Sequence, residues 1–200
     1  MFDGKFRTSV DGVTAPIGKN LDRVGFSADA LTFSGLLFSI AAGWAIAEDY
    51  FWWAIALIAI AGLHDLMDGA VAKASASASQ RGSFFDSVVD RVSDAAMLAG
   101  TTYWLIHHHP GNWVLLPFGL VTTFLLISYQ RSKAESLGIA AKGGLMERAE
   151  RLILLAVALS NHQIFLPVLC VLFALTTMTA LGRFYRVWQA AASVPRSGRS

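Results

Sequence analysis

Six long apolar stretches constrain the fold of this 200-residue chain more than any other feature. Most are near the ~20 residues that an α-helix needs to cross a bilayer, and the fifth is the shortest. With 54% hydrophobic and only 15% charged residues, the chain is too apolar for an ordinary soluble domain. We therefore predict an all-α integral membrane protein with six transmembrane helices, over residues 28–47, 50–73, 83–107, 112–131, 146–160 and 163–186.

Positively charged residues fall on alternate connections between these stretches. Lys and Arg occur before the first stretch, around the second-to-third and fourth-to-fifth connections, and after the sixth. The other connections contain Glu48-Asp49, His107-His108-His109-Pro110 and Asn161-His162, with no Lys or Arg. By the positive-inside rule, both termini and the basic connections face the cytoplasm, which fits an even number of spans. The predicted location is the cell membrane.

The first 25 residues are predicted to form an amphipathic helix on the inner membrane surface. Apolar residues recur at steps of three and four from Val10 to Val24, and Lys19 and Arg23 lie off that stripe. An ordinary helix packed against the body is the alternative. No internal repeat or linker divides the chain, so residues 1–200 are predicted to form one domain with 1–25 as its juxtamembrane segment. The single cysteine, Cys170, excludes a disulfide framework.

Four aspartates stand in apolar sequence at the inner ends of the second and third stretches. Asp65 and Asp68 are three residues apart, and Asp86 and Asp90 are four apart, so each pair shares one helix face. A short connection would make these two helices antiparallel neighbours whose aspartate faces converge. Ionised groups at membrane depth are costly and mark functional sites. Four oxygen donors without nearby His or Cys suit a hard cation, Mg²⁺ or Mn²⁺.

The sequence around these aspartates resembles the signature of the CDP-alcohol phosphotransferase family, Asp-x2-Asp-Gly-x2-Ala-Arg-x8-Gly-x3-Asp-x3-Asp. The spacing matches throughout, with Asp65, Asp68, Gly69, Ala72, Lys73, Gly82, Asp86 and Asp90 at the signature positions. Lys73 replaces the family's Arg, which keeps the charge but loses the bidentate fork that suits phosphate. The six-span layout is also similar to the family's, so the resemblance covers most of the chain.

The resemblance implies a Mg²⁺-dependent membrane enzyme that displaces CMP from a CDP-linked lipid, normally CDP-diacylglycerol, with an alcohol acceptor. It implies that Asp65, Asp68 and Asp86 hold one or two ions. Asp90 is implied as the general base that also touches a second metal. The implied contacts to the CDP-lipid are Asp29, Ala30, Leu31, Thr32, Asp65, Asp68, Gly69, Ala72, Lys73, Ser79 and Gly82. Family members usually form homodimers. Asp94, one turn beyond Asp90, is interpreted as a supporting hydrogen-bonding group or a partner of Arg91.

Basic residues at the cytoplasmic ends of the last three stretches bear on the acceptor. This region is similar to the phosphatidylinositol phosphate synthases of the family, in which positions matching Arg131, Arg151 and Arg183 hold the inositol phosphate group. Three guanidinium groups around a cavity form a good phosphomonoester receptor, although topology alone also places basic residues here. We expect inositol 1-phosphate as the acceptor, giving phosphatidylinositol phosphate and CMP. A phosphatidylglycerophosphate synthase that uses glycerol 3-phosphate is the close alternative.

A divalent-cation transporter is a more remote alternative, and a scaffold without activity is a third. A transporter needs polar residues that continue towards the outer side. Beyond Asp94 the chain instead reads Ala95-Ala-Met-Leu-Ala-Gly100, and this apolar sequence offers no polar path towards the outer side. A scaffold would lack one of the motif's aspartates, and none is missing. No nucleic-acid partner is expected.

Overall fold

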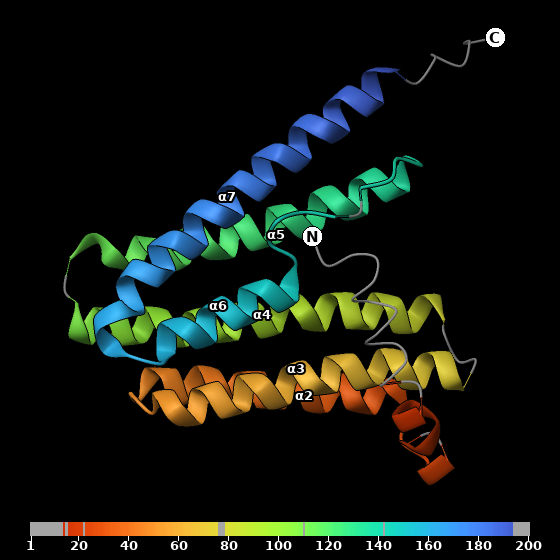
Figure 1. Cartoon of the computed structure of the whole chain (residues 1–200), viewed down its shortest axis with the longest axis horizontal. Coiled ribbons are helices and arrows are strands. Elements are labelled where there is room, and N and C mark those ends of the chain that lie inside the picture. The colour runs from red at the N-terminus through yellow and green to blue at the C-terminus, as the bar shows by residue number, and fades with distance from the viewer. Residues whose placement is uncertain are drawn as a thin grey trace.

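The computed structural model describes residues 14, 16–21, 23–75, 79–109, 111–141 and 143–193, which are almost entirely helical. Long helices joined by short connections run back and forth along the molecule (Figure 1). They are α2 (Ala28–Ala47), α3 (Phe51–Ala74), α4 (Gln80–His108), the 3₁₀ turn η1 (Asn112–Val114), α5 (Leu115–Ser136), α6 (Arg148–Leu159) and α7 (His162–Ser193). The described residues contain no strand, so the predicted all-α class is confirmed.

Four of the described helical segments are long and apolar enough to cross a membrane: α2, α3, Asn112–Ser136 and α7 over His162–Ala192. Two of the six predicted spans differ. The 29 residues of α4 are long enough, but charged residues occupy its first half. The 12 residues of α6 extend about 18 Å at 1.5 Å per residue, well short of the ~30 Å hydrocarbon core. The structure thus has four candidate spans, and the count of six stays a prediction.

Serine caps fix where two of the site helices begin. Ser27 caps α2, and its Oγ accepts a hydrogen bond from the backbone N–H of Ala30 at 3.2 Å. Ser79 caps α4, and its Oγ accepts from the backbone N–H of Gly82 at 3.0 Å. Each cap satisfies one of the N–H groups that the first turn of a helix leaves free. Both helix starts lie beside the cavity described below.

Acidic and basic connections lie at opposite ends of the bundle. Asp49, between α2 and α3, accepts a hydrogen bond from Trp104 of α4 at 2.6 Å and lies 2.7 Å from Nε2 of His162 on α7. Connections without Lys or Arg therefore meet at one end, on the left in Figure 1. Partial burial acts to raise the pKa of Asp49, but the hydrogen bonds from His162 and Trp104 outweigh it and hold that pKa below 3.8.

Helix α2 packs against both α3 and α4, whereas α3 and α4 make no close backbone contact with each other in the described residues. The backbones of α2 and α4 touch at Gly43 and Gly100, where an added Cβ on either would overlap the other helix. Glycines at such crossings let two helices approach closely. The predicted antiparallel neighbours α3 and α4 are therefore connected through α2 rather than by direct backbone contact. Their aspartate faces nevertheless converge.

Most of the predicted amphipathic segment over 1–25 lies outside the described residues. Within it, residues 16–21 and 23–24 are helical. An added Cβ at Gly18 would overlap the backbone of Ala70 on α3, and Leu21 packs against a small cluster of Leu31, Met67 and Val71. The described part of this segment therefore rests on the N-terminal end of α2 and the C-terminal part of α3.

Candidate active site

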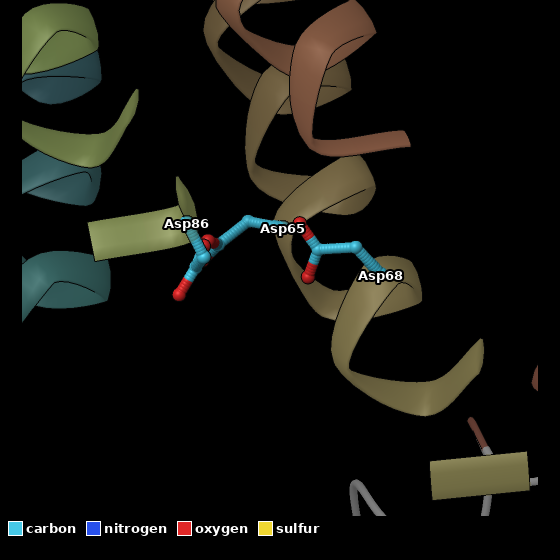
Figure 2. Close-up of side chains that lie close together, drawn as sticks. All are labelled: Asp65, Asp68 and Asp86. Carbon is cyan, nitrogen blue, oxygen red and sulfur yellow. The ribbon is translucent and has the colours of Figure 1, made fainter. Parts of the chain in front are cut away.

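Three carboxylates from two helices meet in the half of the bundle away from Asp49. Asp65 and Asp68 on α3 and Asp86 on α4 each offer an oxygen, and these oxygens lie within 4.8 Å of one another. Figure 2 shows the three side chains turned towards a common point. Around a Mg²⁺ ion with ~2.1 Å bonds, ligand oxygens are spaced by about 3 to 4 Å. Small side-chain rotations would close the cluster around such an ion, so the donor set fits a hard divalent cation.

The hydroxyl of Thr32 fixes one of these carboxylates. Thr32 lies on α2, and its Oγ1 donates to Oδ2 of Asp68 at 2.6 Å. Asp68 is only 7% exposed, so this hydrogen bond satisfies an oxygen that water hardly reaches. Helix α2, which packs against both α3 and α4, thus supplies the side chain that orients a predicted metal ligand.

A cavity of about 580 Å³ opens directly beside the aspartate cluster. Its wall is formed by the starts of α2 and α4 and the end of α3, with Ser27, Ala28, Asp29, Thr32, Asp68, Gly69, Ala72, Ser79, Gln80, Gly82, Ser83 and Asp86 as lining residues. This volume lies within the range of small-molecule and cofactor sites. An added Cβ at Gly69 would meet no atom within 4 Å, so the space above this glycine belongs to the cavity.

Seven of the eleven predicted CDP-lipid contacts line this cavity: Asp29, Thr32, Asp68, Gly69, Ala72, Ser79 and Gly82. The other four do not. Leu31 is buried against Met67 and Val71, and the backbone N–H of Ala30 caps onto Ser27. Asp65 belongs to the aspartate cluster, and Lys73 is absent from the cavity wall. The sequence motif thus predicted residues around the cavity, but it did not show which of them line the cavity and which pack between helices.

Asp90, the predicted base, is not one of the three clustered carboxylates, and it contacts a cation. Its Oδ1 lies 2.8 Å from Nη1 of Arg148, and the same nitrogen lies 2.6 Å from Oδ1 of Asp65. Arg148 is the first residue of α6 and was not among the predicted site residues. A signal for it was present in the sequence. Arg148 and Arg151 both fall in the first turns of a helix, where the helix dipole disfavours cations.

The three predicted acceptor arginines meet in one small cavity of about 90 Å³. Arg131 of α5, Arg151 of α6 and Arg183 of α7 line it together with Asp90, Glu147 and Arg148. Arg183 is 1% exposed and donates to the Ile127 carbonyl at 2.8 Å and to Glu147 at 2.9 Å. Residues from three helices, distant in sequence, thus place a cationic pocket beside the predicted base.

The guanidinium groups of this pocket have unused hydrogen-bonding capacity. Arg151 is 5% exposed, lies 3.3 Å from Asp94 and stacks 4.2 Å above the ring of Phe124. Among the described residues, its Nε and Nη1 and the Nε of Arg183 have no hydrogen-bond partner. Buried donors without partners are costly, and an anionic ligand with several acceptor oxygens would satisfy them.

Asp94 has the supporting position expected for it, but with a different partner. It contacts Arg151 and lies 3.8 Å from Nε of Arg148. The predicted partner, Arg91, instead donates to the Ser87 carbonyl and lies 3.9 Å from Asp90. Asp94 therefore anchors the arginines of α6 rather than an arginine of its own helix.

The chain is similar to proteins of a known family. Residues 26–182 match the family model for CDP-alcohol phosphatidyltransferase. The archaetidylinositol phosphate synthase of Methanothermobacter thermautotrophicus is 36% identical over 192 residues, covering 92% of this chain and 93% of that protein. The phosphatidylinositol phosphate synthase of Mycobacteroides abscessus is 35% identical over 146 residues, covering 71% of this chain and 66% of that protein.

Solved structures show the same fold. Crystal structures of the Mycobacterium tuberculosis phosphatidylinositol phosphate synthase are 26% identical to this chain. The one with CDP-DAG bound has a TM-score of 0.79 and covers 94% of this chain and 98% of that one. The one in complex with manganese and citrate has a TM-score of 0.81 and covers 94% and 93%. The chain belongs to the CDP-alcohol phosphatidyltransferase family, whose members are enzymes.

Proposed function

We propose that this enzyme transfers a phosphatidyl group from CDP-diacylglycerol to inositol 1-phosphate, giving phosphatidylinositol phosphate and CMP. The observation that supports this best is the cavity lined by Arg131, Arg151, Arg183 and Asp90, near the aspartate cluster. A phosphorylated acceptor explains three converging guanidinium groups better than a neutral alcohol does. The names of the two relatives above agree in the inositol phosphate part of the product.

The CDP part of the donor lipid occupies the 580 Å³ cavity. Gly69 and Ala72 have little or no side chain and so leave space in the cavity beside α3. Ser79 and Gly82 belong to the first turn of α4. An added Cβ at Gly82 would come within 3.3 Å of Ser79 Oγ and 3.6 Å of Asp29 Oδ1, so glycine also lets these groups approach. The proposed set of CDP-lipid contacts also keeps Ala30, Leu31 and Lys73. These three do not line the cavity, but they are adjacent in sequence to Asp29, Thr32 and Ala72, which do.

The proposed reaction forms one bond and breaks one bond at the lipid-linked phosphorus. A divalent cation held by Asp65, Asp68 and Asp86 would neutralise diphosphate charge and ease departure of CMP. Asp90 accepts the proton of the attacking inositol hydroxyl as its oxygen bonds to phosphorus. Arg131, Arg151 and Arg183 bind the acceptor's phosphate and orient its hydroxyl. The bond between that phosphorus and the CMP oxygen breaks, and CMP leaves with the electron pair.

The proposal includes a six-helix membrane domain with both termini and the active site in the cytoplasm, at the cell membrane. In the described residues, Lys and Arg fall before α2, at the end of α3, in the first half of α4, at the end of α5, at the start of α6 and in the second half of α7. These are the helix portions away from Asp49, and by the positive-inside rule they support a cytoplasmic location for that side. Helix α4 crosses with its apolar second half, and α6 enters part of the way between α3 and α7. Residues 1–200 then form one domain with 1–25 at the surface, and the enzyme works as the homodimer usual in the family.

Glycerol 3-phosphate is the second candidate acceptor, because the arginine pocket recognises a phosphomonoester whichever alcohol carries it. The first relative's name also leaves the lipid open, since it makes an archaetidyl rather than a phosphatidyl product. Family membership gives no support to the cation-transporter alternative.

CMP release by the purified protein tests the proposal. The assay combines CDP-diacylglycerol and Mg²⁺ with either inositol 1-phosphate or glycerol 3-phosphate, and a parallel series uses CDP-archaeol. The expected result is turnover with inositol 1-phosphate that Asp90→Asn abolishes. Turnover with glycerol 3-phosphate alone would replace the acceptor while keeping the chemistry. Absence of CMP with every acceptor would contradict the transferase proposal.

A further inference from the structure

One carboxylate bridges two of the three arginines that line the proposed acceptor pocket. Oε1 of Glu147 accepts a hydrogen bond from Nη2 of Arg183 at 2.9 Å, and its Oε2 lies 3.6 Å from Nη1 of Arg131. Glu147 lines the same cavity as both arginines. A carboxylate of the chain itself therefore binds guanidinium nitrogens in the pocket where the proposed function puts the acceptor's phosphate.

Local structure does not account for the position of this carboxylate. Glu147 directly precedes α6, a position whose side chain often accepts a hydrogen bond from the backbone of the first turn. Among the described residues its side chain makes no such capping bond. The link from this connection to α7 does not depend on it either, because the Gly143 carbonyl accepts hydrogen bonds from Arg183 and Arg186, both at 3.2 Å. What remains for the carboxylate is its pairing with the two pocket arginines.

The two sides of this pairing differ in their freedom to move. The Arg183 side chain is 1% exposed, and its Nη1 also donates to the Ile127 carbonyl at 2.8 Å, which fixes the guanidinium group. The Glu147 side chain is 35% exposed. An anion that enters the pocket can therefore displace the carboxylate into solvent, whereas the buried arginine stays in place.

A ligand that replaces this carboxylate has to bind the arginines more strongly than the carboxylate does. The carboxylate is attached to the chain, which gives it a high effective concentration at the arginines. Attraction to a guanidinium group scales with the charge of the anion, so a singly charged anion has little advantage over a carboxylate and a neutral alcohol has none. A phosphomonoester carries a charge of about −1.5 to −2 at pH 7 and is favoured over both.

We propose that Glu147 is a specificity-determining residue that acts as an internal competitor for the acceptor's phosphate. Its carboxylate binds the nitrogens of Arg131 and Arg183 until a doubly charged tetrahedral anion displaces it, and singly charged or neutral molecules bind too weakly to do so. The link to the acceptor rests on the proposed function, whereas the anion affinities of the pocket can be measured without turnover.

Sulfate and methanesulfonate are matched probes of this pocket, because both are tetrahedral at sulfur and they differ by one negative charge. Thermal unfolding of the purified full-length protein in detergent, with EDTA and at constant ionic strength, gives the concentration at which each anion half-saturates its stabilising effect. The wild type is expected to bind sulfate at least about tenfold more tightly than methanesulfonate. Glu147→Gln is expected to tighten both anions by a similar factor of at least about tenfold, because the competitor is removed. Glu147→Ala also removes the carboxylate and is expected to behave in the same way.

Two further variants serve as controls. Glu135 accepts a hydrogen bond from Nε of Arg131 at 3.1 Å but does not line the cavity, so Glu135→Gln is expected to leave both anion affinities unchanged. Arg183→Gln is expected to remove the stabilisation by sulfate. Stabilisation that survives Arg183→Gln would place the anion outside this pocket and overturn the proposal.

The direction of each change separates this role from the others that a carboxylate here could have. Weaker anion binding in Glu147→Gln would show that the carboxylate only positions the arginines, and tightening of sulfate alone would show that it stays in the pocket and repels the ligand. Either result, or unchanged affinities, would overturn the proposal. Equal affinity of the wild type for the two anions would do so even if no variant folds.

In turnover, Glu147→Gln is expected to lower KM for inositol 1-phosphate at least about tenfold while KM for CDP-diacylglycerol is unchanged. A protein that shows the expected anion affinities but never releases CMP would refute the proposed function and leave this inference standing. Turnover with inositol 1-phosphate by a protein whose anion affinities do not respond to Glu147→Gln would do the reverse.

Discussion

Replacing Gly69 by alanine adds one methyl group that should impair ligand binding without impairing folding. An added Cβ at this position meets no protein atom within 4 Å, and Gly69 lines the cavity proposed for CDP. The residue sits inside α3, where glycine costs roughly 0.5–1 kcal/mol relative to alanine. The free energy of unfolding should therefore stay level or rise in the variant.

Activity should move in the opposite direction. A methyl group in the cavity pushes the nucleotide away from the α3 backbone by roughly 1 Å, and a misplacement of that size costs about a hundredfold in rate. The expected loss in kcat/KM for CDP-diacylglycerol is thus about a hundredfold, or about 2.7 kcal/mol of transition-state binding.

The assay is CMP release at varied CDP-diacylglycerol, with thermal unfolding of each variant in the same detergent. Gly62→Ala is the matched control on α3, because its Cβ would meet only Leu152 Cδ1 at 4.0 Å. It should leave activity unchanged and, like Gly69→Ala, keep the free energy of unfolding level or raise it. Gly100→Ala should destabilise the protein, because its Cβ would overlap the α2 backbone at Gly43. A Gly69→Ala enzyme with wild-type kcat/KM would refute the placement of the nucleotide against α3.

Three further outcomes follow from the geometry. Arg183→Gln removes a charged hydrogen-bond donor worth about 1.5–3 kcal/mol. Steady-state kinetics should therefore show that KM for the phosphorylated acceptor rises roughly tenfold to a hundredfold while KM for CDP-diacylglycerol is unchanged. An equal rise in both KM values would contradict the acceptor role. EDTA should abolish CMP release and added Mg²⁺ or Mn²⁺ restore it, and Asp68→Asn should weaken Mn²⁺ binding at least about tenfold, which unchanged binding would disprove. The folded-state pKa of Asp49 lies below 3.8, so its stabilising contribution is complete above that pH and is lost as pH falls through the folded-state value. Asp49→Asn should therefore lower the melting temperature at pH 7, with a gap to the wild type that closes below pH 3.8; a gap independent of pH would contradict this.

Helix positions and the aspartate cluster could be predicted because they depend on local spacing. Apolar runs of bilayer length give the helices to within a few residues, and steps of three and four put Asp65 with Asp68 and Asp86 with Asp90 on single faces. The largest differences lie at the C-terminal ends of α5 and α7, which continue to Ser136 and Ser193, beyond the predicted ends at residues 131 and 186.

Relations between helices were harder to predict, because periodicity identifies a buried face but not the neighbour that covers it. Nothing local showed that α2 would pack against both α3 and α4 through Gly43 and Gly100. The contact of Arg148 with Asp65 and Asp90 joins residues far apart in the sequence, so only the fold reveals it. The same holds for Asp94, whose partner lies on α6 rather than one turn away on α4.

Product identity tests the central claim most directly. The enzyme would receive CDP-diacylglycerol and Mg²⁺ with equal amounts of inositol 1-phosphate, glycerol 3-phosphate and free inositol, and mass spectrometry would identify the lipid formed. The account predicts phosphatidylinositol phosphate as the main lipid product, formed in step with CMP. Phosphatidylinositol from free inositol would contradict the role of Arg131, Arg151 and Arg183 as a phosphate receptor, and phosphatidylglycerophosphate alone would contradict the proposed acceptor.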